Sequence, residues 1–318
     1  MAVELHFDDI DLLIIDPSHE VRRILRNMLA DQGFRHISVG ASLADLFTRM
    51  DASMPDLVIS DDQLPDGDLC DVVKKLRHHE VGGNPFVSII ATTWQPTQEA
   101  VRRIVTTGAD DILIKPISAT SMVQHILEQV NHRKPFVVTS NYIGPDRRKP
   151  DNRPSDIPLF QVPNVLREKA VNFRTAAIKD VQKDIDAYIK IVNLEKLDRH
   201  ADQLEWLMER ILSELSIDAA SQAARDLVAH MLAVAEDVSR RMVNTPYAHV
   251  SELCGSLIEV TKRILETDGP PAPKDAQLLK PLVEAIHKGF LESNAEVTAT
   301  VHAITQSVKE RHGKAPGT

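Results

Sequence analysis

Four apolar segments in the N-terminal part of this chain each run into a residue that could take part in phosphoryl or metal chemistry. These residues are Asp16 after 12–15, Asp61 after 57–60, Thr93 after 87–92 and Lys115 after 112–114. Each apolar run is typical of a buried strand. Open α/β sheets place their ligands beyond the carboxyl ends of the strands, so we expect the four side chains to meet at one edge. Two acids, a hydroxyl and a lysine there would make a small site for a metal ion and a phosphoryl group.

The elements that must position these residues alternate between strands and helices up to about residue 132. This order predicts a doubly wound α/β domain with a five-stranded parallel sheet. Residues 20–29 have helical spacing, with Ser18 as the N-cap. Residues 97–107 predict another helix, which Gly108 ends. The last helix of this domain is expected from about residue 118 to residue 132.

With these four residues in place, residues 8–132 resemble the receiver domain of two-component response regulators, in particular the chemotaxis type. The resemblance implies that Asp61 is the phosphoacceptor and that Lys115 contacts the phosphoryl group. It implies that the Thr93 hydroxyl is the switch that responds to phosphorylation. It also implies a sensor histidine kinase or a histidine phosphotransfer protein as the partner that donates the phosphoryl group.

The resemblance further implies an Mg²⁺ ion held by Asp16, Asp61 and the backbone carbonyl of Gln63. Such an ion would neutralise the transferring group, since phosphoryl transfer depends mainly on positioning and charge neutralisation. The family usually has two adjacent acids after the first strand, and here the second is Pro17. We therefore expect weak Mg²⁺ binding. Asp62 follows Asp61 on an extended chain and is expected to point away from the site.

Further departures from the family pattern lie beside the expected site. Trp94 stands where the family prefers a small residue, and it would narrow the entrance to the phosphoacceptor. Ile112 replaces the aromatic switch residue of the fifth strand. We take Gln63, Trp94, Gln95 and Ile112 as modulating residues. A pseudo-receiver that binds partners without being phosphorylated remains an alternative interpretation.

Composition bounds the remaining possibilities. A length of 318 residues predicts two domains, and only 4% aromatic residues favours a helix-rich protein. Residues 1–132 carry 20 acidic and 11 basic side chains, so their net charge equals the −9 of the whole chain. The later part is nearly neutral, so we do not expect nucleic-acid binding. Cys70 and Cys254 fall in different domains, which predicts a reducing cytoplasm. The chain offers no membrane-spanning apolar run or signal peptide, so no membrane association is expected.

Residues 133–163 are rich in proline and basic residues and predict a linker that is semi-rigid where prolines cluster. Within it, the segment Tyr142-Ile143-Gly144-Pro145-Asp146-Arg147-Arg148 mixes an aromatic, a tight turn and a basic pair. Two interpretations stay open for this segment. It is either a docking strap that lies on the acidic domain or on a partner, or a solvated linker.

Residues 164–318 show repeated helical spacing of apolar residues, which predicts a helical bundle. The longest helix is expected from about Pro281 to Arg311, with Pro281 in its first turn. Its surplus apolar stripe favours a homodimer through this domain. His230 is followed by leucine and small residues, as in histidine phosphotransfer domains, but the lysine and glycine of that pattern are missing.

The sequence thus predicts a cytoplasmic response regulator with domains at 1–132, 133–163 and 164–318. We expect a protein that is not an enzyme beyond phosphotransfer and self-dephosphorylation. Its helical domain would dimerise or bind an output protein whose identity the sequence does not give. A catalytic helical domain, acting in phosphotransfer or as a phosphatase, is the main alternative.

Overall fold

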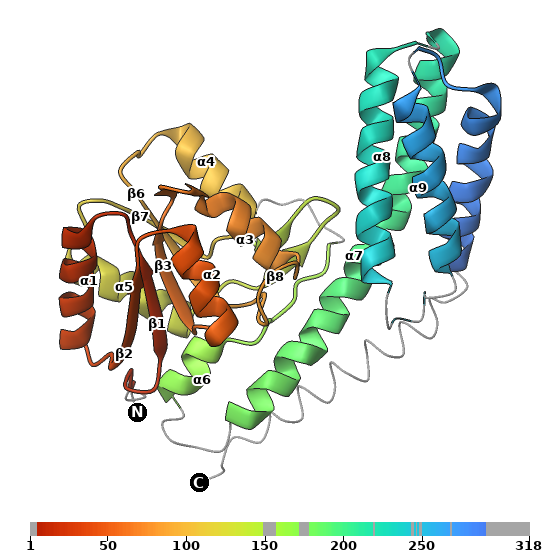
Figure 1. Cartoon of the computed structure of the whole chain (residues 1–318). Helices are drawn as coiled ribbons and strands as arrows, with labels where there is room; N and C mark the ends of the chain where they lie inside the picture. The colour runs from red at the N-terminus through yellow and green to blue at the C-terminus, as the bar shows by residue number, and fades with distance from the viewer. Residues whose placement is uncertain are drawn as a thin grey trace. The chain divides into compact units, whose positions relative to one another are not determined.

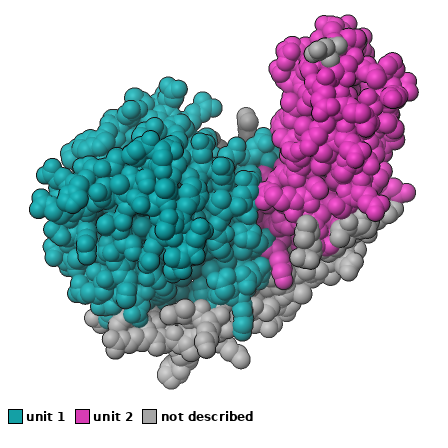
Figure 2. All heavy atoms as spheres, viewed as in Figure 1, with its two compact units in different colours: residues 1–189 teal, residues 190–318 magenta. Residues whose placement is uncertain are grey.

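The structure, a computed structural model, describes residues 5–148, 157–171, 178–218, 220–242, 245, 247, 250–267 and 269–290. The chain forms two compact units, residues 1–189 and residues 190–318 (Figure 2). The sequence predicts divisions at residues 132 and 163 instead. The first unit extends further because residues after 132 pack on the same core. The functional division into three parts stays a prediction.

Unit 1 is built on a parallel sheet with the strand order β2-β1-β3-β6-β7 (Figure 1). Its strands are β1 (Asp11–Ile15), β2 (His36–Gly40), β3 (Leu57–Asp61), β6 (Ser88–Thr93) and β7 (Asp111–Ile114). The central strands β3 and β6 are buried along their whole length, as expected when helices cover both faces of a parallel sheet. The predicted doubly wound α/β domain is confirmed.

The helices of unit 1 divide between the two faces of the sheet. One face carries α1 (His19–Asp31) and α5 (Ala119–Asn131), and the other carries α2 (Leu43–Ala52), α3 (Leu69–Arg77) and α4 (Gln98–Thr107). Ser18 accepts a hydrogen bond from a backbone N–H in the first turn of α1 and caps this helix as predicted. Thr97 and Ser118 cap α4 and α5 in the same way. Gly108 ends α4 with a φ of 98°, a conformation that favours glycine.

A short hairpin follows β3 and leads into α3. It consists of β4 (Gln63–Leu64) and β5 (Gly67–Asp68). Asp68 caps α3 by accepting a hydrogen bond of 2.8 Å from the backbone N–H of Cys70. Asp66 accepts hydrogen bonds of 2.7 and 2.9 Å from the first two backbone N–H groups of α2. The hairpin after Asp61 is therefore fixed to the helices on either side of it.

Within unit 1, residues 133–148 and 157–171 pack on the α/β domain that precedes them and are called the strap. The strap contains β8 (Phe136–Val138), β9 (Ile143–Pro145) and α6 (Val165–Val171). β8 and β9 pair as an antiparallel hairpin, and Pro145 fits because it lies at the end of an edge strand. Leu166 and Ala170 of α6 join the core between α1, α5 and the sheet. The segment expected to be a linker is thus partly folded on the N-terminal domain.

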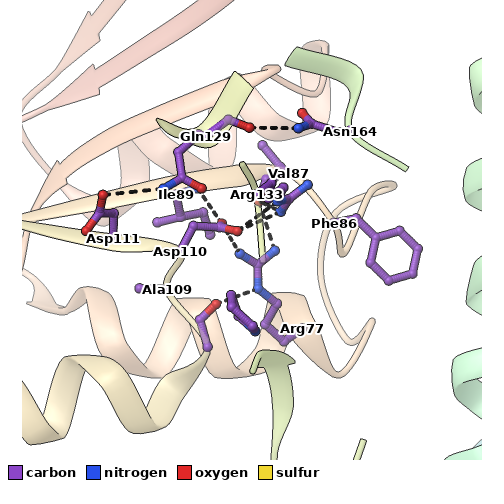
Figure 3. Close-up of polar contacts among 12 residues, drawn as sticks. Arg77, Phe86, Val87, Ile89, Ala109, Asp110, Asp111, Gln129, Arg133 and Asn164 are labelled. Carbon is purple, nitrogen blue, oxygen red and sulfur yellow. Dashed lines mark hydrogen bonds and ion pairs between the residues drawn. The ribbon is translucent and has the colours of Figure 1, made fainter. Parts of the chain in front are cut away.

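Buried charges anchor the strap. The carboxylate of Asp110 accepts hydrogen bonds from Arg77 at 2.7 Å, from Arg133 at 2.9 Å and from the backbone N–H of Ile89 at 2.8 Å (Figure 3). Both guanidinium groups lie 5.2 Å from the centre of the Phe136 ring, which belongs to β8. The ion pairs are almost fully buried, so neither partner can exchange its contact for water.

The strap also touches the backbone of the α/β domain directly. A Cβ atom on Gly144 would lie 2.7 Å from Cα of Gly108, and one on Gly108 would lie 2.6 Å from the carbonyl oxygen of Ile143. Only glycine leaves room for this approach. Arg147 donates to the carbonyl oxygens of Ala109 and Asp110 next to it. These contacts are those expected of a docking strap rather than of a solvated linker.

Unit 2 contains helices packed around one apolar core. They are α7 (Ile178–Ile217) from residue 190 onward, α8 (Gln222–Arg241), α9 (Ser251–Glu266) and the helical residues 273–290. The predicted helical bundle is confirmed. The last helix begins at residue 273, so the prediction that Pro281 lies in its first turn was wrong. The predicted end of that helix at Arg311 lies outside the described residues.

In the described ranges, no helix has the length and apolar character needed to cross a membrane.

Cys70 and Cys254 are both buried and free. Burial raises the pKa of the Cys70 thiol to about 11 and that of the Cys254 thiol to about 12. Both are therefore protonated near neutral pH, where the thiol is a poor nucleophile.

Candidate functional site

The four strand-end residues meet at the carboxyl edge of the sheet. Asp61 and Thr93 are the last residues of β3 and β6, and Asp16 and Lys115 directly follow β1 and β7. These strands are neighbours in the order β1-β3-β6-β7, so the parallel pairing alone brings the four side chains to one side. All four residues are at most 5% exposed.

Lys115 holds the two acids together. Its ammonium donates to Oδ2 of Asp16 and to Oδ2 of Asp61. The other oxygen of each carboxylate accepts a backbone hydrogen bond, at 2.8 Å from the N–H of Ser18 and at 2.9 Å from the N–H of Gln63. The buried cluster of two carboxylates and one ammonium carries one net negative charge. It can attract one further cation, or attack an electrophilic phosphorus atom through a carboxylate oxygen.

Thr93 and the residues after it form the wall of the site beside Lys115. The Thr93 hydroxyl accepts a hydrogen bond of 3.0 Å from the backbone N–H of Gln95. The Trp94 side chain is 59% exposed, and its ring centre lies 5.6 Å from the Lys115 ammonium. This distance is within the range of a cation–π contact, so Trp94 adds to the forces that hold the lysine. Gln95, one of the expected modulating residues, contacts Thr93 through its backbone N–H, and its side chain is exposed.

Asp62 points away from Lys115, as the extended chain predicted. It is buried, and its Oδ2 lies 2.6 Å from Nη2 of Arg103 in α4. Arg103 also donates to Asp68 at the start of α3. The sequence reasoning missed this arginine, because nothing in the local pattern pairs a helix residue with an acid 41 positions earlier.

Pro17 and Ile112 lie beside the site and contribute no polar side chain to it. Pro17 contributes its carbonyl oxygen, which accepts a hydrogen bond of 3.1 Å from Arg22 of α1. Ile112 is half-buried and packs against the core under α2, α3 and α4. Over the part of the chain that is described, no group of three or more His, Cys, Asp or Glu residues is arranged to hold a metal ion. A cation at this edge would depend on Asp16, Asp61 and backbone carbonyls.

Two histidines of unit 2 differ in their surroundings. His230 is exposed on α8, with Nε2 3.0 Å from the side-chain nitrogen of Gln203. His200 is buried in α7, with Nε2 2.8 Å from Asp237 and Nδ1 3.1 Å from Gln203. Burial lowers the pKa of His200, although its hydrogen bond to Asp237 opposes this. Of the two, His230 is the one that a partner protein can reach.

Comparison with known proteins matches residues 12–127 to the family model of the response regulator receiver domain. No family matches the C-terminal region. The transcriptional regulatory protein GltR of Pseudomonas aeruginosa is 32% identical over 119 residues, which cover 36% of this chain and 46% of that protein. A protein-glutamate methylesterase/protein-glutamine glutaminase of Methanospirillum hungatei is 24% identical over 135 residues, or 42% of this chain and 39% of that protein. The chain thus spans less than half the length of these two relatives.

Among solved structures, the receiver domain of the sensor histidine kinase PA1611 from Pseudomonas aeruginosa is similar, with 23% identity and a TM-score of 0.34. The match covers 38% of this chain and 97% of that domain, whose structure has a magnesium ion coordinated in its active-site cleft. The family match spans the strands and helices whose ends carry Asp16, Asp61, Thr93 and Lys115. Residues 12–127 of this chain form a response regulator receiver domain.

Proposed function

We propose that this chain is a response regulator that accepts a phosphoryl group on Asp61 and signals through its helical unit. The observation that carries the proposal is the contact of Lys115 with both Asp16 and Asp61 at the carboxyl edge of the sheet. This is the arrangement of acids and lysine that the receiver resemblance requires. A sensor histidine kinase or a histidine phosphotransfer protein in the cytoplasm is the proposed donor.

The chemistry follows from the residues present. A carboxylate oxygen of Asp61 forms a bond to the phosphorus atom of phosphohistidine. The P–N bond breaks, and the electron pair leaves with the imidazole of the donor, which takes up a proton. Lys115 neutralises negative charge on the phosphoryl oxygens, and the Thr93 hydroxyl donates a hydrogen bond to one of them. Phosphoryl transfer needs this positioning and charge neutralisation more than further covalent help.

The residues present fit a magnesium ion, with fewer acids than the family pattern supplies. Asp16, Asp61 and the carbonyl of Gln63 are oxygen ligands, the type that Mg²⁺ prefers. When bound, the ion would neutralise charge on the phosphoryl oxygens. Pro17 removes one carboxylate, and Asp62 is engaged by Arg103. We therefore propose that Mg²⁺ binds through two carboxylates and binds weakly.

The test is phosphorylation of the full chain with Mg²⁺ and acetyl phosphate. The wild type should gain one phosphoryl group by intact mass, and the product should hydrolyse in base as an acyl phosphate does. Asp61→Asn should gain none, because its amide is not a nucleophile at neutral pH. Asp71→Asn, at an exposed acid in the first turn of α3, is the matched control and should label normally.

Three results would point elsewhere. Labelling of Asp61→Asn as strong as that of the wild type would place the phosphoryl group on another residue. Acid-labile, base-stable label would identify a phosphohistidine, and loss of that label in His230→Gln would support a phosphotransfer role for unit 2. A wild type that no donor labels, including candidate kinases, would favour the pseudo-receiver.

For unit 2 we propose a homodimer or a contact with an output protein. Its exposed large apolar side chains support an interaction role, with Trp206 57% and Ile217 79% exposed. Light scattering of the full chain at micromolar concentration should give the mass of a dimer. A monomer would contradict the dimer and leave a different protein as the partner of this unit.

A further inference from the structure

One arginine ties the loop after the proposed phosphoacceptor to α4. Nη2 of Arg103 lies 2.6 Å from Oδ2 of Asp62, and Nη1 donates to Oδ2 of Asp68. Asp62 is 3% exposed and directly follows Asp61 in the chain. The guanidinium therefore bridges the end of β3 and the N-cap of α3 from a position in the middle of α4.

A second set of contacts joins the same groups through Gln63. Its backbone N–H donates to Oδ1 of Asp61 at 2.9 Å, and its side-chain amide donates to Oδ2 of Asp68 at 3.2 Å. Asp68 is the other acid that Arg103 contacts. The carboxylate of Asp61 is thus connected to Arg103 by one covalent path through Asp62 and by one hydrogen-bonded path through Gln63.

We propose that Arg103 is the positioning residue that transmits phosphorylation of Asp61 to α4. The inference rests on the proposed function, since it requires that Asp61 accepts a phosphoryl group. A phosphoryl group adds negative charge and new acceptor oxygens next to Asp62. Arg103 is already fixed there by two carboxylates, so the added charge strengthens its attraction to the loop. The result is a helix α4 that is held more tightly against the phosphorylated site.

This path does not need an aromatic switch on the fifth strand. The apolar side chain of Ile112 cannot form a hydrogen bond or an ion pair that changes on phosphorylation. A guanidinium, in contrast, presents several donors in a fixed geometry and can contact two acids at once. Arg103 is one-third exposed, so its side chain has room to follow a change at Asp62 or Asp68. An arginine that only stabilised the fold would contribute equally with and without the phosphoryl group.

The experiment compares the full chain with Arg103→Gln and with Arg102→Gln, a control that removes the same charge from the exposed neighbour in α4. Each protein is treated with Mg²⁺ and acetyl phosphate, and phosphorylation is read by intact mass. Hydrogen–deuterium exchange of the α4 amides is then measured with and without the donor. If Arg103→Gln does not fold, as judged by thermal melting, Arg103→Lys takes its place, because a lysine cannot present two parallel donors.

In the wild type and in Arg102→Gln, phosphorylation should slow exchange in α4 by on the order of five-fold. In Arg103→Gln, α4 should exchange faster before treatment and should not respond to phosphorylation, although Asp61 is still labelled. An equal response of α4 in Arg103→Gln and in the wild type overturns this role for Arg103. So does a labelled wild type whose α4 does not respond. A wild type that no donor labels overturns the proposed function itself, and the inference with it.

Discussion

Arg77→Met should destabilise unit 1 and weaken the contact of Phe136, a strap residue, with the receiver domain. Arg77 is fully buried at the end of α3 and is the centre of the contacts drawn in Figure 3. Its guanidinium donates to the carbonyl oxygens of Gly108, Pro85 and Val87 and to the carboxylate of Asp110. Methionine has a similar length but donates no hydrogen bond, so each of these acceptors loses a buried partner.

The expected loss of unfolding free energy depends on the buried carboxylate of Asp110, which remains after the substitution. Removing one partner of a buried ion pair costs about 3–5 kcal/mol, because the other charge is left in a medium of low polarity. Asp110 keeps its contact with Arg133, which places the expected loss near the lower limit, about 3 kcal/mol. Burial lowers the pKa of Arg77 to about 10, against the attraction of Asp110, so the side chain is still charged at pH 7. The variant therefore removes a full charge at neutral pH.

Urea unfolding of the full chain, followed by circular dichroism, measures the change in unfolding free energy. In thermal unfolding, a domain of this size loses about 2–4 °C in Tm per kcal/mol, so Tm of the receiver transition should fall by about 10 °C. Lys75→Met, on the exposed side of α3, is the matched control and should stay within about 0.5 kcal/mol of the wild type. A loss below about 1 kcal/mol in Arg77→Met would refute the reasoning, since it would mean that the buried acceptors find other donors at little cost.

Three further outcomes are expected. Pro17→Asp should tighten Mg²⁺ binding by about ten-fold, read from the fluorescence of Trp94 beside Lys115; an unchanged affinity would mean that another ligand already fills the role. Gly144→Ala should cost unit 1 about 1–3 kcal/mol, because the new Cβ meets the backbone of the receiver, whereas Gly83→Ala meets nothing within 4 Å and should cost less than about 1 kcal/mol. Burial lowers the pKa of His200 in the folded protein below its ordinary value of about 6.5. Between these two pKa values the unfolded chain binds more protons, so stability falls as pH drops below about 6.5. Unfolding curves at pH 7.5 and 5.5 should show a smaller difference in His200→Gln than in the wild type.

The convergence of Asp16, Asp61, Thr93 and Lys115 was predictable because it depends on backbone topology alone. Each of them ends or directly follows a strand, and parallel pairing brings those ends to one edge of the sheet. The N-cap of α1 at Ser18 was predictable for a similar reason, since a cap acts within three or four residues of its own position. Local patterns of this kind are visible in one sequence without any tertiary information.

The position of the strap was harder to predict, because the residues that hold it lie in several separate segments of the chain. Its prolines indicate an irregular chain, and Pro145 does end the hairpin rather than continue it. Two contacts hold the strap in place. The backbones of Gly108 and Gly144 touch, and the Phe136 ring packs against Arg77 and Arg133. The contacts of Gly108 with Gly144 and of Arg77 with Phe136 join residues far apart in the chain. A local pattern indicates the turn but does not identify the surface that the turn meets.

The pairing of Asp62 and the replacement at Pro17 act on the same quantity, the number of carboxylates free to bind a cation. Only Asp16 and Asp61 remain, and each has one oxygen on Lys115 and the other on a backbone N–H. A magnesium ion that binds the two Oδ2 atoms must therefore compete with the ammonium of Lys115. Half-maximal phosphorylation should therefore need a higher concentration of Mg²⁺ than in a site with three acids, because the ion has one carboxylate fewer and must displace the ammonium. The weak metal site and the arginine on Asp62 are then two consequences of how this chain distributes its acids around the phosphoacceptor.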